Sequence, residues 1–409
     1  MKGLSSCRSC GATQSRLVLD LGQQPLANRL LRPDDLSAFE PRFPLRLQVC
    51  TACWLLQIAD EVPPADLFSE YLYFSSFSDT MLNHARQAAD RYRGDYDLGP
   101  GSLVIEIASN DGYLLRNFVT SGIPCLGIEP AENIARVARA QGVRTRTEFF
   151  GEALAERLVD EGQAADLVLG NNVFAHAPNP NDFVAGLQRV LKPGGRVILE
   201  FPYAVDFLER CEFDTVYHEH VFYFTLTALE PLFDRHGLAL TRVERLAIHG
   251  GSLRLFAARK GEHPVEESVD TALREEAAVG IRSPEPYARF AGRARALREE
   301  LRTLLEQLRA EGRRVAACGA SAKGSTLLNF LELAPGTIEF VVDRSPHKQG
   351  RYTPGTHLPI HPPEHLSAEQ PDYTLLLTWN FADEILRQQQ AYRDRGGRFI
   401  VPLPELQIV

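Results

Sequence analysis

Residues 103–130 read LVIEIASNDGYLLRNFVTSGIPCLGIEP. Two short apolar runs, LVIEIAS and PCLGIEP, stand on either side of a segment with helical spacing. Two more apolar runs follow, ADLVLGNNV at 165–173 and RVILEFP at 196–202, again with a helix-period segment between them. This alternation predicts an α/β domain with a doubly wound, Rossmann-like sheet, and ligands of such sheets bind outside the carboxyl ends of the strands.

The predicted strands end in polar side chains suited to a nucleoside. Glu129 ends the second strand, where a carboxylate can accept both hydroxyls of a ribose. The first loop has a single glycine, too few for the close backbone approach that a dinucleotide pyrophosphate needs. The order of these pieces resembles class I methyltransferases, which implies S-adenosylmethionine as the cofactor. The candidate cofactor residues are Glu106, Ala108, Asn110, Asp111, Gly112, Glu129, Pro130, Asn171 and Asn172.

The densest group of chemically active residues is Tyr217-His218-Glu219-His220, which we expect directly after the strand at 196–202. An imidazole takes a proton near neutral pH, a carboxylate orients it, and a phenol hydrogen-bonds an oxyanion. In an extended segment, Tyr217 and Glu219 would point to one side and the two histidines to the other. A metal site on the His-x-His pair and a polar loop with satisfied histidines are the alternatives.

Length and composition indicate a globular protein of two or three domains. The chain has 409 residues, of which 44% are hydrophobic and 24% charged. A net charge of −9 argues against a nucleic-acid partner. With neither a secretion signal at the amino terminus nor an apolar run of membrane-spanning length, we expect a cytoplasmic protein without membrane contact.

Four of the seven cysteines form two CxxC pairs, Cys7 with Cys10 and Cys50 with Cys53. Four thiolates at such spacing predict a tetrahedral zinc site, and they leave no open coordination position, so the zinc is expected to be structural. A redox-active pair is the alternative. We expect Cys125 and Cys211 to be core residues.

The last part of the chain predicts a second nucleotide-type fold. Residues 265–312 have helical periodicity and predict either a solvated linker or a dimer contact. A strand, a loop from Gly319 to Gly324 and a helix then form an anion site, and Asp343 ends the next strand, at 338–342. NAD is an alternative ligand here. The candidate substrate residues of this part are Ser321, Lys323, Gly324, Ser325 and Asp343.

Several motifs together resemble the nucleotide-sugar C-methyltransferases of deoxysugar biosynthesis. They are the CxxC pairs, GQQPLAN, YLYFSSFS, EIASNDG, GIEPA, NNVFAH, YHEHVFYF, HGGSLR, GASAKGSTLLN and VVDRSPHKQG, and they span the chain. The resemblance implies a dTDP-linked 4-keto-deoxysugar as substrate, methylated from S-adenosylmethionine on a carbon next to the ketone, commonly carbon 3. It further implies a zinc-binding domain at 1–80, a methyltransferase domain at 81–262 and a nucleotide-sugar-binding domain at 263–409.

The resemblance also assigns roles to individual residues. His220 is the implied general base, Glu219 and Tyr217 assist the enolate, Tyr71 and His176 line the sugar pocket, and His249 of HGGSLR contacts the substrate. Ala108 stands where the family usually has glycine.

Two other functions stay open at this point. One is an O- or N-methyltransferase of the same fold, and the other is a zinc-ribbon scaffold protein with regulatory nucleotide folds. We expect a monomer or a weak homodimer.

Overall fold

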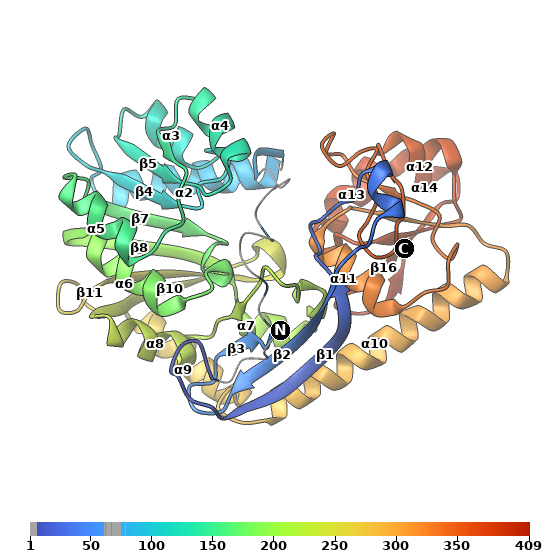
Figure 1. Ribbon diagram of the computed structural model, residues 1–409, viewed down its shortest axis with the longest axis horizontal. Coiled ribbons are helices and arrows are strands. Elements are labelled where there is room, and N and C mark those ends of the chain that lie inside the picture. Colours follow the sequence, from blue (N-terminus) through green and yellow to red (C-terminus); the bar gives the residue numbers. More distant parts are fainter. Residues whose placement is uncertain (1–5, 61, 63–66, 68–74, 78) are drawn as a thin grey trace.

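The computed structural model describes residues 6–60, 62, 67, 75–77 and 79–409. Within them lie three β-sheets (Figure 1). The large central sheet and the carboxyl-terminal sheet form two lobes, and a small sheet near the amino terminus lies between them. One continuous cluster of buried hydrophobic side chains includes residues from all three sheets, so the sheets pack as one body.

The central sheet has the strand order β10-β11-β8-β7-β4-β5-β6. Its strands are β4 (Val104–Ile107), β5 (Cys125–Ile128), β6 (Thr145–Arg146), β7 (Ala165–Asn171), β8 (Leu191–Pro202), β10 (Leu238–Leu246) and β11 (Ser252–Arg259). The first five run parallel, while β11 is antiparallel to both β8 and β10. The doubly wound sheet predicted from the apolar runs is therefore confirmed.

Helices cover both faces of this sheet. They are α2 (Asp79–Asp95), α3 (Leu115–Thr120), α4 (Glu132–Ala140), α5 (Glu152–Asp160), α6 (Pro180–Val190), α7 (Ala204–Glu209) and α8 (Leu226–Arg235). Local chemistry sets their boundaries: α6 begins where the Asn179 side chain accepts two backbone N–H groups and Pro180 takes the first helical position.

The small sheet consists of β1 (Ser15–Pro25), β2 (Arg42–Cys50), β3 (Leu56–Ile58) and β9 (Phe222–Tyr223). Its last strand comes from the middle of the chain, directly after His220, and pairs with β3. The Tyr217–His220 stretch is thereby tied to the amino-terminal part of the chain.

The carboxyl-terminal sheet has the order β14-β13-β12-β15-β16-β17. Its strands are β12 (Val315–Cys318), β13 (Val341–Val342), β14 (Ile360–His361), β15 (Tyr373–Leu376), β16 (Arg398–Val401) and β17 (Gln407–Ile408). The helices of this part are α9 (Glu267–Val279), α10 (Glu285–Ala310), α11 (Ala322–Leu331), α12 (Glu364–Glu369), α13 (Ala382–Gln388) and α14 (Gln390–Asp394). The strand expected over 338–342 is correct in place, but only its last two residues pair with β12.

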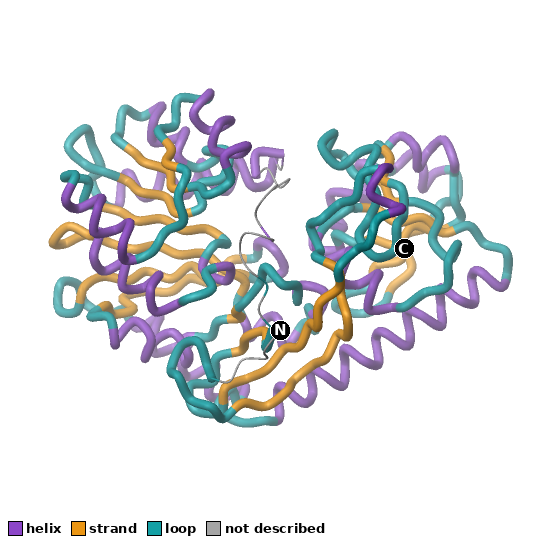
Figure 2. Tube along the Cα trace, viewed as in Figure 1, coloured by secondary structure: helices purple, strands orange, loops and turns teal. Residues whose placement is uncertain are grey.

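The helical segment predicted at 265–312 is real, but it is not a solvated linker. Helix α10 is 26 residues long and buries a row of apolar side chains that includes Phe290, Leu301 and Leu305. Together with β1 and β2 it runs from the central part of the molecule to the carboxyl-terminal lobe (Figures 1 and 2). No described helix is long and apolar enough to cross a membrane.

Candidate functional site

A cavity of about 830 Å³ lies where the three sheets meet, and all three parts of the chain line it. Twelve of the candidate residues are in its wall: Ala108, Asn110, Glu129, Pro130, Asn171, Asn172, His176, Tyr217, His220, Ser321, Lys323 and Asp343. A volume of this size fits a small-molecule ligand. Motifs that are far apart in the sequence thus line the same cavity.

On the methyltransferase side, Glu129 holds two loops together. One of its oxygens accepts the Asn110 N–H at 3.0 Å and the other accepts the Ala131 N–H at 2.9 Å. Burial raises the pKa of Glu129, and these two N–H groups oppose the rise. Each carboxylate oxygen can accept more than one hydrogen bond, so a ribose can still bind here.

The loop after β4 is folded tightly. Ala108 and Asn110 in this loop have positive φ, at 53° and 50°, and so does Asn172 after β7, at 54°. Gly112 has φ 81°, and a Cβ atom there would lie 2.9 Å from Val143. Left-handed backbone at non-glycine residues is characteristic of ligand sites.

Two buried acids belong to this region, Glu106 in β4 and Asp111 in the loop itself. Glu106 and Asp111 are fully buried, and both Glu106 oxygens and Asp111 Oδ1 have no hydrogen-bond partner among the described residues. Burial, together with the charges of Asp111 and Glu129, raises the pKa of Glu106 well above its usual value. Orphaned buried oxygens of this kind fit a polar, cationic cofactor such as S-adenosylmethionine.

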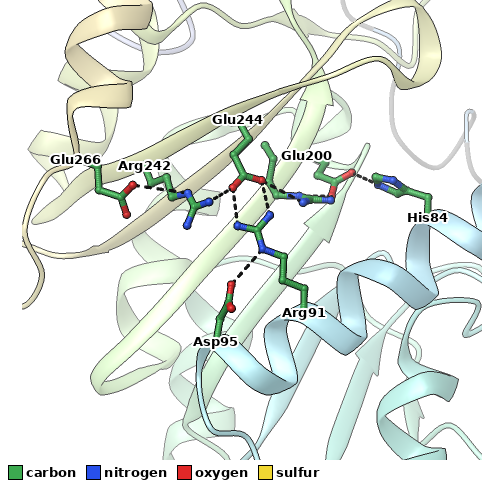
Figure 3. Close-up of polar contacts among 8 residues, drawn as sticks. His84, Arg91, Asp95, Glu200, Arg242, Glu244 and Glu266 are labelled. Carbon is green, nitrogen blue, oxygen red and sulfur yellow. Dashed lines mark hydrogen bonds and ion pairs between the residues drawn. The ribbon is translucent and has the colours of Figure 1, made fainter.

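Helix α2 is fixed against the central sheet by a chain of charged side chains (Figure 3). His84 lies 2.7 Å from Glu200, and the other Glu200 oxygen lies 2.6 Å from Arg254. Burial favours a higher pKa for Glu200, but the hydrogen bond from His84 and the charge of Arg254 lower it below its usual value. Arg254 and Arg91 both contact Glu244, which extends the chain across β10.

The short helix η2 (Ser75–Phe77), just before α2, contacts the cofactor loop. The Ser75 N–H donates to Asn110 Oδ1 at 2.9 Å, and the Ser76 N–H donates to Asp111 Oδ2 at 3.2 Å. Ser75 also lines the cavity. The segment before α2 therefore forms part of the cofactor pocket.

The Tyr217–His220 stretch differs from its expected geometry. It does not follow β8 directly, because α7 and the short helix η4 (Phe213–Thr215) intervene. It is also a turn rather than extended, and the His220 N–H donates to the Tyr217 carbonyl at 2.9 Å. Tyr217 and His220 consequently face each other, with Tyr217 Oη 2.6 Å from His220 Nε2.

The hydrogen bonds of His220 define its tautomer. Nδ1 lies 3.0 Å from the Thr215 carbonyl oxygen, which can only accept, so Nδ1 carries the proton. In the neutral ring Nε2 is then the basic nitrogen, and it accepts from the Tyr217 phenol. The half-buried His220 lines the cavity, so this nitrogen lies at the cavity wall.

His176, on the short helix η3 (Phe174–His176), packs edge-on against the His220 ring with 4.8 Å between centroids. Desolvation lowers the pKa of His176 to about 4, so its ring is neutral at physiological pH. Phe174 and Phe224 stack behind it at 4.4 Å. A neutral ring in this place does not repel a proton that moves to His220.

Glu219 and His218 do not line the cavity. Glu219 accepts from Asn28 Nδ2 at 2.7 Å, and burial raises its pKa to about 7. His218 Nε2 donates to the Pro44 carbonyl at 3.1 Å, and Phe43 packs against its ring. The expected side of Glu219 was therefore wrong: the carboxyl holds Asn28 of GQQPLAN, and Asn28 rather than Glu219 lines the cavity.

The carboxyl-terminal side of the cavity is built around α11. The Ser321 side chain caps this helix by accepting the Gly324 N–H at 3.1 Å. Asp343 accepts the Ala320 and Ser345 N–H groups, each at 2.8 Å, and lies 3.5 Å from Lys348 Nζ. Lys323 also lies in this wall, with its ammonium group buried. The helix amino terminus and two lysines favour an anion.

Not every candidate residue lies in the wall. Glu106 lies in β4, Asp111 and Gly112 lie in the loop after it, and Gly324 and Ser325 are inside α11; none of these five lines the cavity. His249 belongs to the short helix η5 (Ile248–Gly250), but its side chain falls outside the described part of the chain. Tyr71 falls outside the described residues. Asn28, Ser75, Thr215 and Lys348 line the cavity without having been singled out, although Asn28, Ser75 and Lys348 belong to motifs quoted from the sequence.

The four cysteines come together as predicted. Their sulfur atoms all lie within 4.8 Å of one another, with Cys7 to Cys53 at 3.6 Å and Cys10 to Cys50 at 3.7 Å. A tetrahedral zinc with bonds of about 2.3 Å holds its sulfurs roughly 3.8 Å apart. Among the described residues this is the one group of His, Cys, Asp and Glu side chains arranged for a metal, and it leaves the His-x-His alternative without support.

The order of the central sheet and the polar residues along its edge define an S-adenosylmethionine-dependent methyltransferase. Three family models match the chain: a "Methyltransferase domain" at residues 82–243, a "Putative zinc binding domain" at 7–68 and a "C-methyltransferase C-terminal domain" at 247–404.

The chain is 37% identical to C-methyltransferase NovU of Streptomyces niveus over 410 residues, which covers 100% of this chain and 98% of that protein. It belongs to this family of C-methyltransferases. The match to a ubiquinone biosynthesis O-methyltransferase of Bartonella bacilliformis is 24% identical and covers 26% of this chain and 44% of that protein.

Among solved structures, magnesium protoporphyrin IX methyltransferase of Synechocystis with bound S-adenosylmethionine has a TM-score of 0.34 at 17% identity, covering 44% of this chain and 79% of that chain.

Proposed function

We propose that this C-methyltransferase acts on a dTDP-linked 4-keto-deoxysugar and methylates a carbon next to the ketone, most often carbon 3. The observation that carries the proposal is the position of His220. Its basic Nε2 lies in the wall of one cavity, between a loop suited to S-adenosylmethionine and a helix amino terminus with two lysines. A cation site and an anion site on either side of one base fit a methyl donor and a nucleotide sugar.

The proposed mechanism begins with proton removal. A carbon next to a ketone becomes a nucleophile once it loses a proton, because the charge moves to the ketone oxygen as an enolate. When the sugar displaces the Tyr217 phenol, His220 Nε2 takes that proton, and Tyr217 donates to the enolate oxygen. The Thr215 carbonyl stabilises the imidazolium through Nδ1–H. Bound S-adenosylmethionine supplies the electrophilic methyl group.

We assign the remaining residues by their position. Glu129, Asn110, Asn171 and Asn172 hold the methyl donor, and Ser321, Lys323, Lys348 and Asp343 hold the nucleotide sugar. The division at 1–80, 81–262 and 263–409 follows these roles, although β9 also joins the first part to the second.

The proposal is tested by incubating the purified protein with S-adenosylmethionine and a panel of dTDP-4-keto-deoxysugars. Mass spectrometry detects the methylated product, and NMR locates the new methyl group. A methyl group on a carbon next to the ketone supports the proposal and identifies the substrate, whereas a methyl group on oxygen or nitrogen overturns the role of His220.

We further propose that Cys7, Cys10, Cys50 and Cys53 bind a structural zinc ion. Elemental mass spectrometry is expected to find about one zinc per chain, and a chelator is expected to lower the melting temperature. A metal-free protein with unchanged melting would overturn this assignment.

A further inference from the structure

The carbonyl of Thr215 determines how the His220 ring is held. It accepts from His220 Nδ1 and from Tyr223 Oη, each at 3.0 Å. Thr215 is the last residue of η4 and is buried. A shift of η4 would therefore turn the ring and move its basic nitrogen.

Residues on both sides of Thr215 are held by the carboxyl-terminal part of the chain. Asp214 Oδ2 accepts from Trp379 Nε1 at 2.7 Å, and the Val216 carbonyl accepts from Thr326 Oγ1 at 3.0 Å. Trp379 belongs to the short helix η6 (Trp379–Phe381), and Thr326 belongs to α11. The lobe that carries the anion site thus also fixes the segment that orients the base.

Lys323 connects these contacts to the cavity. Its Nζ lies 4.7 Å from the centroid of the Trp379 ring, is buried, and has no hydrogen-bond partner among the described residues. Asp214 Oδ1 likewise has no partner there. The indole therefore has a cation over its face and a carboxylate at its N–H, and both contacts strengthen when shielded from water.

We propose that Trp379 and Asp214 are positioning residues for His220, and that Lys323 links this pair to the anionic group of the substrate. The inference rests on the proposed function, since the anion is the diphosphate of the nucleotide sugar. The charge of Lys323 already acts on the buried carboxyls of Asp214 and Glu212, and a diphosphate at the start of α11 gives its ammonium group a hydrogen-bond acceptor and fixes the side chain over the indole. The indole N–H then holds Asp214, η4 and the Thr215 carbonyl, so the base is set when the substrate is bound.

The main test is Trp379→Phe, which keeps a ring under Lys323 but removes the N–H donor. Because a small misplacement of a catalytic group can cost about 10²-fold, we expect kcat to fall by roughly 10- to 100-fold. The KM of the sugar nucleotide and the Kd values of dTDP and S-adenosylmethionine should change little. Solvent deuterium exchange at the carbon next to the ketone should slow in parallel with kcat.

Variants at Asp214 provide a second route to the same answer. Asp214→Asn still offers an oxygen to the indole N–H and should retain most of kcat, whereas Asp214→Ala should behave like Trp379→Phe. The matched control is Glu40→Gln. Glu40 joins the β1–β2 arm to the same lobe through the Gly355 N–H at 2.9 Å, but it does not contact η4. Glu40→Gln should leave kcat unchanged.

The link through Lys323 is tested with the double variant Lys323→Met/Trp379→Phe. Residues that act together have non-additive effects, so the double variant should lose less kcat than the product of the two single losses. A double variant whose loss of kcat equals the product of the two single losses overturns the link, and normal kcat in both Trp379→Phe and Asp214→Ala overturns the positioning role.

If the wild-type protein methylates none of the dTDP-4-keto-deoxysugars, the substrate proposal fails, not the positioning of the base. The positioning claim is then decided by diethyl pyrocarbonate labelling of His220, where an unchanged rate in Trp379→Phe refutes it.

Discussion

Glu129 and Asp343 occupy equivalent positions in two different sheets. Each follows the second strand of a parallel set, β5 or β13. Each accepts one backbone N–H from the loop after the first strand and one from its own loop. The donors are Asn110 and Ala131 for Glu129, and Ala320 and Ser345 for Asp343. The two halves of the cavity thus share one way of joining their loops.

They differ in charge. The Glu129 side carries two further buried acids, Glu106 in β4 and Asp111 in the loop after it, whereas Lys323 and Lys348 stand beside the Asp343 loops. A sulfonium cation is favoured on the first side and a diphosphate on the second. Two loops of similar architecture can therefore accept two different nucleosides in one cavity. The local charge then decides which side binds the methyl donor and which side binds the nucleotide sugar.

The largest expected effect on turnover comes from His220, which belongs to neither half of the cavity. His220→Asn should lower turnover by about 10²–10⁴-fold, because it removes the proton acceptor. The affinities for S-adenosylmethionine and dTDP should stay near those of the wild type, as measured by calorimetry. Near-normal turnover would exclude His220 as the base.

Exchanging one charge on each side should separate the two affinities. Lys323→Met should weaken dTDP binding by about 10- to 100-fold and leave S-adenosylmethionine binding intact, since a charged hydrogen bond is worth about 1.5–3 kcal/mol. Glu129→Gln should do the opposite. Lys260→Met and Glu132→Gln make the same two charge changes at surface residues outside the cavity, and they serve as controls. Equal losses for both ligands in either cavity variant would contradict the comparison.

The first residue of the loop after β12 and the first residue of the loop after β4 should differ in their effect on stability, although by a smaller amount. Gly319 has φ 95°, and a Cβ atom there would lie 2.4 Å from Thr378 Oγ1, so Gly319→Ala should cost about 1–3 kcal/mol of unfolding free energy. Ala108 holds the equivalent place at φ 53°. In Ala108→Gly, relief of about 1 kcal/mol of strain is offset by the greater flexibility of glycine in the unfolded chain, so stability should barely change. Urea unfolding measures both, and an unchanged unfolding free energy of Gly319→Ala would contradict the close approach of Thr378 to this position.

Much of the fold could be predicted from the sequence because its signals are local. The apolar runs predicted β4, β5, β7 and β8. The two CxxC pairs predicted the sulfur cluster for the same reason, since residue type and spacing determine it.

The conformation of the Tyr217–His220 stretch could not be predicted this way. Its turn is held by β9 pairing with β3 and by Trp379 and Thr326, all distant in sequence. The side to which Glu219 points depends in the same way on Asn28. Periodicity gives no information on such contacts.

The most direct test uses a dTDP-4-keto-deoxysugar labelled with deuterium on the carbon that is to be methylated. The wild-type protein, given this substrate and S-adenosylmethionine, should release a product that carries a new methyl group and has lost the deuterium, because His220 must remove that atom before the carbon can react. A methylated product that retains the deuterium would show that the methyl group had gone elsewhere, and it would contradict carbon methylation through an enolate.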